Sequence, residues 1–519
     1  MSRLGAFLLG LVLCTGLLLR LVPFLVTWEP FSTDVWPLIR ASEKIVSNPG
    51  VRIWDDAAFD GYNNRWPGVI LAAALVSRVT GASQWLAYSF LLLSASLSAS
   101  SLLFYALGRR VFRERIPALV LLATWLFYPP VAVFSATLLK EVYAYPFLFA
   151  LLLIAAGGSR RDTLLAGLLA GALVLSHHLA SVMASSLLLG TAVVCFALKN
   201  VGYCRGSCPV KAGRSAMLGL LAGAFFSAYY LAYGGKAMPL KLGLLDAVML
   251  AVYACYLTLG TVVYLKFSRV GYVEGLVGIA VVVLLLFSSR TPIVEGLGVN
   301  YRELLPYVAP AFAPYVFLVS RKYSSREHLA LVYALAVPPS VFSLYVFLAR
   351  PELASTLHRF MNYYFLPAGI LLGVVANMRR RVFRAGVAAV VLALVLSSAS
   401  LVALSASGRG PAFYWRYSRS EVWGLEAISK FLPGGSACGD DKVYYFYAGA
   451  VRVDTGCILA RSYAGKATSP GAPLIVLREY YLRGYVSGLS VYQVDSFLAS
   501  LVGSSRVFDS GEVLVALDG

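Results

Sequence analysis

Long apolar runs recur along the first 404 residues of this 519-residue chain, and most are near the length that crosses a membrane. About 20 apolar residues of α-helix span the hydrocarbon core of a bilayer. Backbone polar groups inside that core must bond within their own segment, so runs of this kind are helical. The mean hydropathy of +0.75 and the 13% of charged residues agree, because a soluble chain carries about twice that charged fraction. The sequence therefore predicts a polytopic α-helical membrane protein.

The net charge of +19 comes from short basic loops between the apolar runs. When these loops are placed on one side of the membrane, that side holds 20 Lys and Arg residues against four acids. Cytoplasmic loops of membrane proteins carry this kind of excess. We therefore expect a multi-pass protein of the cell membrane, with the basic loops inside the cell. Because these loops account for the net charge, we expect no nucleic-acid partner.

The number of spans depends on residues 67–81, which make only about 15 residues, or roughly 22 Å, of helix. We expect this segment to lie along the outer surface, because every basic loop then falls inside. The first run, at 4–27, has no small-residue cleavage site after it, and we interpret it as a retained helix. Thirteen spans follow, at about 4–27, 84–107, 116–136, 142–157, 163–176, 179–198, 215–233, 244–266, 271–288, 304–320, 329–349, 363–377 and 385–404.

The odd number of spans places residues 405–519 outside the cell, as an extracytoplasmic domain after a membrane domain of residues 1–404. The composition changes there: apolar runs shorten, and basic and acidic residues nearly balance. We expect a small α/β domain with helices at 420–431 and 494–503 and strands within 442–449, 473–481 and 511–519. Cys438 and Cys457 could form a disulfide in this domain, and two buried thiols are an equal alternative.

Residues that could do chemistry gather in the outer loops, above all in the first, residues 28–66. Asp34 follows the first span among Trp28, Phe31 and Trp36, and a charge held in such an apolar collar carries a desolvation cost. The other candidates have ordinary interpretations too, as solvated loop residues, helix caps, interfacial anchors or local ion pairs. They are Asn64, Arg65, Lys140, Glu141, His177, His178, Arg302, His358 and Arg359.

Four stretches resemble the GT-C superfamily of integral-membrane glycosyltransferases. "DVWPLIRASEKI" (34–45) resembles its first-loop acid and helix, and "RWPGVILAAALVSRVTG" (65–81) resembles the juxtamembrane helix that follows. "LLKEVYAYP" (138–146) resembles the second acidic motif, with Glu141 in the place of the acid. "LHRFMNYYFLPAGILLG" (357–373) resembles the late outer loop whose Arg contacts the phosphate of a lipid-linked donor.

This resemblance implies the roles of several residues. Asp34 would be the general base, with Glu141 as a second catalytic acid, and Arg359 would bind the donor phosphate. We also expect His358, Arg302, Lys140, Asn64 and Arg65 to bind donor or substrate. No cofactor is implied for certain. His177 and His178, together with Asp34 or Glu141, could hold a divalent metal with mixed oxygen and nitrogen ligands.

Two departures from the superfamily pattern matter. A single Glu141 follows Lys140 where a pair of acids, or an acid flanked by Arg, is usual. Residues 405–519 lack the Trp-Trp-Asp-Tyr-Gly signature of oligosaccharyltransferases, which argues against transfer of a whole glycan to asparagine.

The expected function is transfer of a hexosyl or pentosyl group from a polyprenyl-phosphate donor at the outer membrane face. The acceptor would be a lipid, a glycan or a protein of the cell envelope. A multi-pass transporter or lipid flippase is the alternative, and a non-catalytic assembly protein is a third. A transporter would carry acids buried in the middle of its spans; Asp246 is the only acid near a span, and it lies at the end of one.

Overall fold

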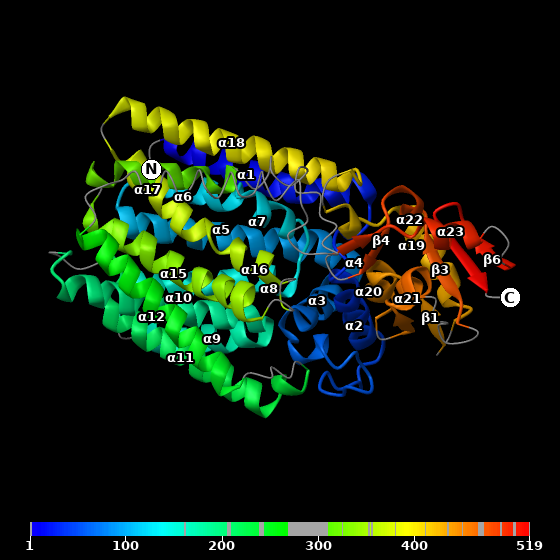
Figure 1. The fold of residues 1–519 in the computed structure, drawn as a ribbon. Coiled ribbons are helices and arrows are strands. Elements are labelled where there is room, and N and C mark those ends of the chain that lie inside the picture. The colour runs from blue at the N-terminus through cyan, green and yellow to red at the C-terminus, as the bar shows by residue number, and fades with distance from the viewer. Residues whose placement is uncertain are drawn as a thin grey trace.

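The computed structural model describes residues 3–159, 162–204, 209–237, 243–267, 310–323, 325–350, 353, 356–378, 380–409, 412–432, 435–448, 450–464, 472–487, 490–501 and 505–517. Within these ranges, nine helices are long and apolar enough to cross a membrane, and they form an elongated bundle (Figure 1). They are α1 (Arg3–Thr27), α4 with η2 and α5 (Gln84–Phe112), α8 (Lys140–Gly157), α10 (His178–Asn200), α11 (Ala212–Ala232), α12 (Leu244–Phe267), α15 (Arg326–Ala349), α16 with α17 (Leu357–Ala376) and α18 (Arg381–Ala406).

Three apolar helices are shorter: α3 (Gly68–Thr80), α6 (Arg115–Leu126) and α9 (Asp162–Ser176). The helix predicted at 116–136 is wrong as one continuous element, because α6 ends at Leu126 and α7 (Pro129–Phe134) begins anew. Pro129 and Pro130 lack the backbone N–H that a continuing helix needs. The count of thirteen spans therefore stays a prediction. The span expected at 271–288 and the first part of the one expected at 304–320 lie outside the described residues; residues 313–323 form the 3₁₀ helix η4 (Ala313–Tyr323).

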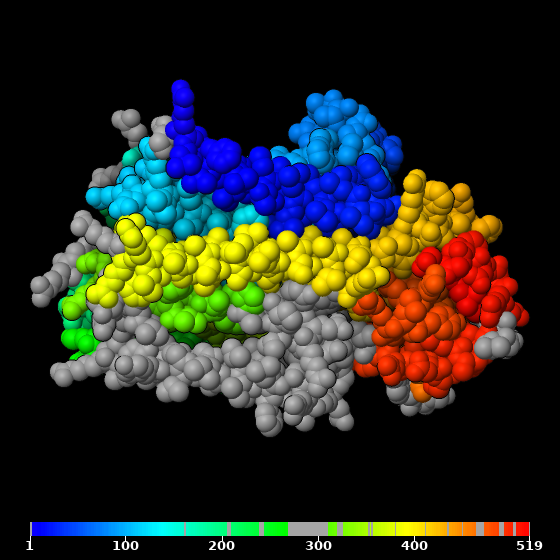
Figure 2. Space-filling view, turned by 90° about the horizontal axis from the view of Figure 1, so that it is seen from above, coloured from blue at the N-terminus to red at the C-terminus, as the bar shows by residue number. Residues whose placement is uncertain are grey.

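The centre of the bundle is α17 (Phe365–Ala376), which is buried along its whole length between α6 and α15. Beside it, the rings of Phe104, Trp125, Phe149 and Phe365 pack edge to face. α1 and α18 lie side by side along one face of the bundle (Figure 2).

Arg20 explains how the first span tolerates a charge. Its side chain is fully buried, and its guanidinium donates to Ser135 Oγ at 3.1 Å and to the carbonyl of Gly16 at 3.2 Å. The charged side chain therefore joins α1 to the end of α7 instead of facing lipid.

One end of the bundle is covered by α2 (Val35–Ser47), η1 (Asn63–Arg65) and α3, which lie between the spans and the C-terminal segment (Figure 1). α2 is anchored by Ser42, whose hydroxyl lies 2.8 Å from Tyr88 Oη in η2 (Ala87–Leu91) and donates to the carbonyl of Ile70 at 3.2 Å. These bonds fix α2 on the bundle and so fix the position of Asp34 at its start.

The strands of the described chain all lie after α18. The main sheet has the order β2-β1-β3-β7-β6; β1 pairs with β2 and β3 in parallel, while β3, β7 and β6 are antiparallel. A separate hairpin pairs β4 with β5. The elements are η6 (Phe413–Trp415), α19 (Arg419–Ser429), β1 (Ser436–Cys438), α20 (Asp441–Tyr447), β2 (Arg452–Asp454), α21 (Cys457–Ala464), β3 (Leu474–Leu477), α22 (Glu479–Leu482), β4 (Tyr485–Ser487), β5 (Ser490–Tyr492), α23 (Asp495–Ser500), β6 (Ser505–Asp509) and β7 (Val513–Leu517).

The strand predicted within 442–449 is wrong, because this segment forms α20. Asp440 caps the helix: its side chain accepts a hydrogen bond from the backbone N–H of Val443 at 3.1 Å. An Asp at this position is a common helix start, and it outweighs the β-propensity of the tyrosines that follow. α20 packs against α2, with the Phe446 ring 4.8 Å from the Trp36 ring.

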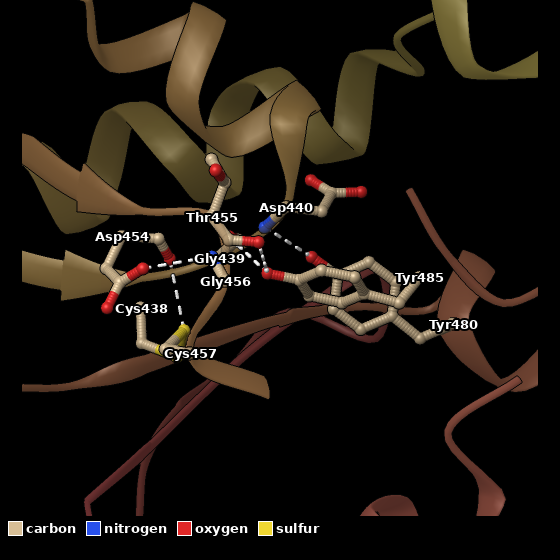
Figure 3. The surroundings of a disulfide bond; sticks show 9 residues. All are labelled: Cys438, Gly439, Asp440, Asp454, Thr455, Gly456, Cys457, Tyr480 and Tyr485. Carbon is tan, nitrogen blue, oxygen red and sulfur yellow. Dashed lines mark hydrogen bonds between the residues drawn. A yellow bond between two sulfur atoms is a disulfide. The ribbon is translucent and has the colours of Figure 1, made fainter. Parts of the chain in front are cut away.

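Cys438 and Cys457 form a disulfide, with their Cα atoms 5.9 Å apart, which decides between the two alternatives that the sequence left open. Figure 3 shows the bond between the end of β1 and the start of α21. Beside it, Tyr485 Oη donates to the carbonyl of Gly439 at 2.6 Å and to that of Thr455 at 2.9 Å. The loops that follow β1 and β2 are thus joined both covalently and by hydrogen bonds.

A fully buried lysine joins three helices of the C-terminal segment. Lys442 of α20 donates to Glu421 of α19 at 2.9 Å and to Glu479 of α22 at 2.8 Å. Burial alone would lower the pKa of Lys442, but the charges of Glu421 and Glu479 outweigh it and raise that pKa above its usual value. Lys442 therefore stays charged and paired.

Replacing Lys442 by Met should leave two carboxylates buried without their shared cation. Removing one partner of a buried ion pair costs about 3–5 kcal/mol, so we expect the amides of α20 to exchange with solvent far faster in Lys442→Met than in the wild type. Native-state hydrogen exchange on the full chain measures this. The control is Lys430→Met, at an exposed position at the end of α19; equal exchange in the two variants would contradict the account.

Candidate active site

Two cavities meet at Asp34. The larger, which we call the membrane cavity, has a volume of about 510 Å³ and runs between the spans. One part is apolar and is lined from α10, α11, α12 and α15 by Leu179, Val182, Phe226, Leu250, Phe342 and Val346. The other part carries polar and charged groups, among them Asp34, His178, His358, Arg359, Asp441, Lys442 and Tyr445.

The smaller cavity, of about 180 Å³, is the polar cavity. Its wall includes Asp34, Asp60, Lys140, Glu141, His177 and Arg359. Asp34 and Arg359 line both cavities, so they lie where the polar part of the membrane cavity adjoins the polar cavity.

Asp34 and Arg359 form an ion pair between segments 325 residues apart in sequence. Arg359 Nη2 in α16 (Leu357–Asn362) donates to Asp34 Oδ2 at 3.1 Å. Asp34 precedes the first turn of α2 but makes no capping hydrogen bond, so its carboxylate is directed to Arg359 instead. The two side chains are 33% and 26% exposed, and they are therefore accessible to a ligand.

The loop before Asp34 is held in an unfavourable backbone conformation. Trp28 and Ser32 have φ values of +58° and +88°, a region that residues other than glycine adopt at a cost. The backbone N–H of Ser32 donates to the carbonyl of Trp415 in η6 at 2.8 Å. The segment after α18 therefore helps to hold the loop, and strain of this kind is concentrated at functional sites.

Phenol side chains surround Asp34. The negative charge of Asp34, together with burial, raises the pKa of Tyr445 in α20. Burial raises the pKa of Tyr62 to about 12. Both phenols are thus neutral at physiological pH and can donate hydrogen bonds to a substrate near Asp34.

Glu141 lies in the first turn of α8 and is almost fully buried. Its Oε1 accepts a long hydrogen bond of 3.4 Å from Tyr145 Oη, and its Oε2 has no hydrogen-bond partner among the described residues. An unsatisfied buried carboxylate oxygen is costly. Glu141 lines the polar cavity, although its Oε2 is itself closed to solvent and the Tyr363 phenol lies close to the carboxylate.

Lys140 is oriented by a residue that the sequence did not single out. Its Nζ donates to Asn63 Oδ1 at 2.8 Å and lies 4.1 Å from the centre of the Tyr62 ring. Asn63 is held in turn by Asp60, which accepts from the Asn63 backbone N–H at 2.6 Å and from its side-chain amide at 2.5 Å. The cation of Lys140 is therefore positioned in the wall of the polar cavity.

Asn64 and Arg65, which the sequence predicted to bind substrate, line neither of these cavities. Asn64 donates to Asp56 and to the carbonyl of Ile53, and Arg65 forms an ion pair with Asp56 and donates to the carbonyl of Tyr233. The turn of η1 directs Asn63 to the cavity and its two neighbours to the loop. Arg302, also predicted to bind substrate, lies outside the described residues.

The two histidines are adjacent at the start of α10, with ring centres 4.6 Å apart. His177 Nδ1 accepts from the backbone N–H of Ala180 at 3.3 Å, which is a helix-capping contact. In the described part of the chain, no three His, Cys, Asp or Glu side chains stand close enough to hold a metal ion. A divalent metal at these residues stays a prediction.

Comparison with known proteins gives the same architecture. The structure is similar to that of the Archaeoglobus fulgidus oligosaccharyltransferase tethered with an acceptor peptide, with a TM-score of 0.51, 12% identity, and coverage of 92% of this chain and 70% of that one. The apo form of the same enzyme gives a TM-score of 0.50 at 13% identity, with coverage of 92% and 70%. The match to the structure of ArnT from Cupriavidus metallidurans bound to undecaprenyl phosphate covers 98% of this chain and 97% of that one, at 13% identity and with a TM-score of 0.43.

No family model matches the chain, and no curated protein matches it in sequence. At identities this low, the likeness to the oligosaccharyltransferase structures shows a shared fold and nothing finer. The structure therefore agrees, at the level of the fold, with the resemblance seen in the sequence.

The ion pair between Asp56 and Arg65 should fasten the first outer loop without serving the cavities. Side-chain hydrogen bonds from Asn64 and Arg65 lower the pKa of Asp56, so its carboxylate is ionised and paired at neutral pH. We expect Asp56→Asn to speed amide exchange of residues 53–66 at least about tenfold, since hydrogen bonds to charged groups contribute ~1.5–3 kcal/mol. Asp55→Asn, at an exposed neighbouring position, is the control. Unchanged exchange in Asp56→Asn would show that the pair does not hold the loop.

Proposed function

We propose that this chain is a membrane glycosyltransferase that moves one sugar from a polyprenyl-phosphate donor to an acceptor at the outer membrane face, with Asp34 as general base. One observation carries this proposal: the Asp34–Arg359 pair lines both the membrane cavity, which has an apolar part between the spans, and the polar cavity. A donor with a lipid tail and a sugar head needs such a junction. The GT-C fold supports the same class of reaction.

The donor's polyprenyl tail would lie along the apolar wall between α10, α11, α12 and α15. Its phosphate would then reach Arg359, whose planar guanidinium suits phosphate oxygens. A phosphate bound there would compete with Asp34 for the guanidinium, so donor binding would release the Asp34 carboxylate for its role as a base.

In the reaction, the acceptor hydroxyl attacks the anomeric carbon of the sugar as Asp34 takes the hydroxyl proton. The bond between the anomeric carbon and the phosphate oxygen breaks, and the polyprenyl phosphate leaves with its negative charge near Arg359. Attack from the side opposite the phosphate inverts the anomeric centre. The sugar is thus transferred in one step without a covalent enzyme intermediate.

The remaining cavity residues suit binding roles. The carboxylate of Glu141, in the wall of the polar cavity, would accept from a sugar or acceptor hydroxyl, while Lys140 and His358 would contact the donor head. Arg302 remains proposed for the same role. Asn64 and Arg65 would act only through the loop that they hold.

The orientation of the site follows from the position of the basic loops. α5 (Leu92–Phe112) follows α4, which packs near α2, and carries Arg109 and Arg110 in its last turn, at the far end from Asp34. If the arginines are cytoplasmic, as the positive-inside rule implies, Asp34 and the C-terminal segment lie outside.

Asp34→Asn should abolish most turnover while donor binding is largely kept. The amide still accepts a hydrogen bond from Arg359 but takes no proton, and general-base catalysis is worth ~10²–10⁴-fold. We expect at least about a hundredfold loss. Arg359→Ala should instead weaken donor binding as well, because it removes the partner of the phosphate in the ground state.

The assay measures sugar release from a panel of polyprenyl-phosphate-linked hexoses and pentoses in liposomes, beside donor affinity. Asp55→Asn is the matched control for the loss of one acid in the same loop. If Asp34→Asn retains turnover while Asp55→Asn or Asp56→Asn abolishes it, another acid of this loop is the base. If no donor is turned over by the wild type, or none of the three acids matters, the proposed function is wrong.

A further inference from the structure

A second cleft lies on the other side of α2 from the polar cavity. It has a volume of about 510 Å³ and lies between the end of α1, α2, α4 (Gln84–Leu86) and α19 of the C-terminal segment. We call it the tryptophan cleft. Its wall contains Trp28, Trp36, Trp85 and Trp423, with Glu29, Arg40, Glu43, Arg419 and Glu426.

The sequence of α2 explains why the cleft and the active site are separate. Trp36, Arg40 and Glu43 line the cleft at a spacing of three and four residues, which places them on one helix face. Pro37 and Leu38 line the polar cavity on the other face. A helix with its side chains is ~10–12 Å across, so this width separates the cleft from the acid before α2.

Indole rings are presented on both sides of the cleft. Trp28 and Trp423 are 55% and 60% exposed, although they are large and apolar. Trp28 and Trp85 both pack edge to face against Phe24, with ring centres 5.7 and 5.5 Å away, which fixes their planes. The positive φ of Trp28 directs this ring outward from the end of α1.

Charged groups of both signs stand between the rings, close enough to act on one another but without a direct ion pair among the described residues. Among the described residues, neither Arg40 nor Arg419 forms an ion pair: Arg40 lies over the Phe446 ring at 4.8 Å, and Arg419 over the Trp423 ring at 4.9 Å. Glu29 is 5% exposed. Its carboxyl group accepts one long hydrogen bond, from Trp85 Nε1 at 3.3 Å. Burial raises the pKa of Glu29 to about 7, so its carboxyl can donate or accept at neutral pH.

Two buried donors of the wall lack acceptors. The indole Nε1 of Trp36, a side chain 5% exposed, and the Nε of Arg40 have no hydrogen-bond partner among the described residues. Buried polar groups rarely lack a hydrogen-bond partner, because each unsatisfied donor or acceptor costs ~1–3 kcal/mol of stability. Both belong to the face of α2 that lines the cleft, but neither atom is open to solvent, so a ligand in the cleft would bind the exposed rings and charged groups first.

We infer that the tryptophan cleft binds a saccharide, as the non-reacting part of an acceptor glycan. The apolar C–H face of a sugar ring can lie against an indole ring, while its hydroxyls donate to carboxylates and accept from guanidinium groups. That this saccharide is part of the acceptor rests on the proposed function, whereas saccharide binding by the cleft does not depend on it.

Other ligand classes fit the wall less well. Acidic and basic side chains are interspersed in the wall, with Glu29, Glu43 and Glu426 beside Arg40 and Arg419, so neither a phosphate nor a cation would meet charges of only the opposite sign. A lipid tail would need an apolar wall such as that of the membrane cavity. A neutral ligand with many hydroxyls can satisfy both signs at once.

The test is saturation-transfer NMR on the full chain in lipid nanodiscs, because sugar-headed detergents would compete for the cleft. The probes are short neutral gluco-, manno- and galacto-oligosaccharides at millimolar concentration. We expect at least one series to bind and Trp423→Ala to weaken it at least tenfold, which is ~1.4 kcal/mol. Trp54→Ala, at a similarly exposed tryptophan of the first outer loop that lines neither cavity nor the cleft, should bind as the wild type.

Absence of binding by every series would overturn the inference, as would equal weakening in Trp423→Ala and Trp54→Ala. In that case the tryptophans act as anchors in the lipid interface. Binding that depends on Trp423 in a chain without sugar release would uphold the cleft and count against the proposed transferase. Sugar release without any such binding would do the reverse.

Discussion

The ion pair between Asp34 and Arg359 joins the start of α2 to α16, and the candidate site is arranged around it. Neither residue has a role in the packing of the bundle that would require a charge. Each lines both the membrane cavity and the polar cavity, and each is partly accessible. Solvent screening limits what such a partly exposed ion pair adds to stability, and a ligand that uses the two charges explains better why they are held at this junction.

The C-terminal segment belongs to this arrangement. Trp415 holds the strained loop before Asp34, Tyr445 faces the Asp34 carboxylate, and Lys442 and Asp441 reach the wall of the membrane cavity. The same segment supplies α19 to the tryptophan cleft. Its sheet, disulfide and buried Lys442 cluster therefore support two surfaces that face the bundle, and the position of α20 against α2 couples them.

The broad features of the fold could be predicted from the sequence because they depend on local patterns. Apolar runs predict helices wherever they lie, and an acid in an aromatic collar is unusual enough to single out Asp34. Arg359 followed from the resemblance of residues 357–373 to a superfamily motif. The helix at 419–429 follows from its helical spacing and its capping residues, and the last strand follows from its β-branched composition, which are local signals as well.

What could not be predicted depends on packing between distant segments. Asn63 rather than Asn64 reaches Lys140 because the single turn of η1 rotates successive side chains by about a third of a circle. The place of Tyr445 at the site could not be predicted, because the composition of its segment is typical of a strand, although Asp440 is a local signal for a helix start. The wall of the tryptophan cleft comes from four elements, and only their folding brings the indoles together.

The central claim is that a lipid-linked phosphate binds at the junction of the two cavities, and a structure of the chain with a polyprenyl phosphate bound tests it most directly. We expect the phosphate within hydrogen-bond distance of Arg359, the tail along α10, α11, α12 and α15, and the Asp34 carboxylate turned toward the polar cavity. A phosphate bound elsewhere, with the Asp34–Arg359 pair intact, would contradict it.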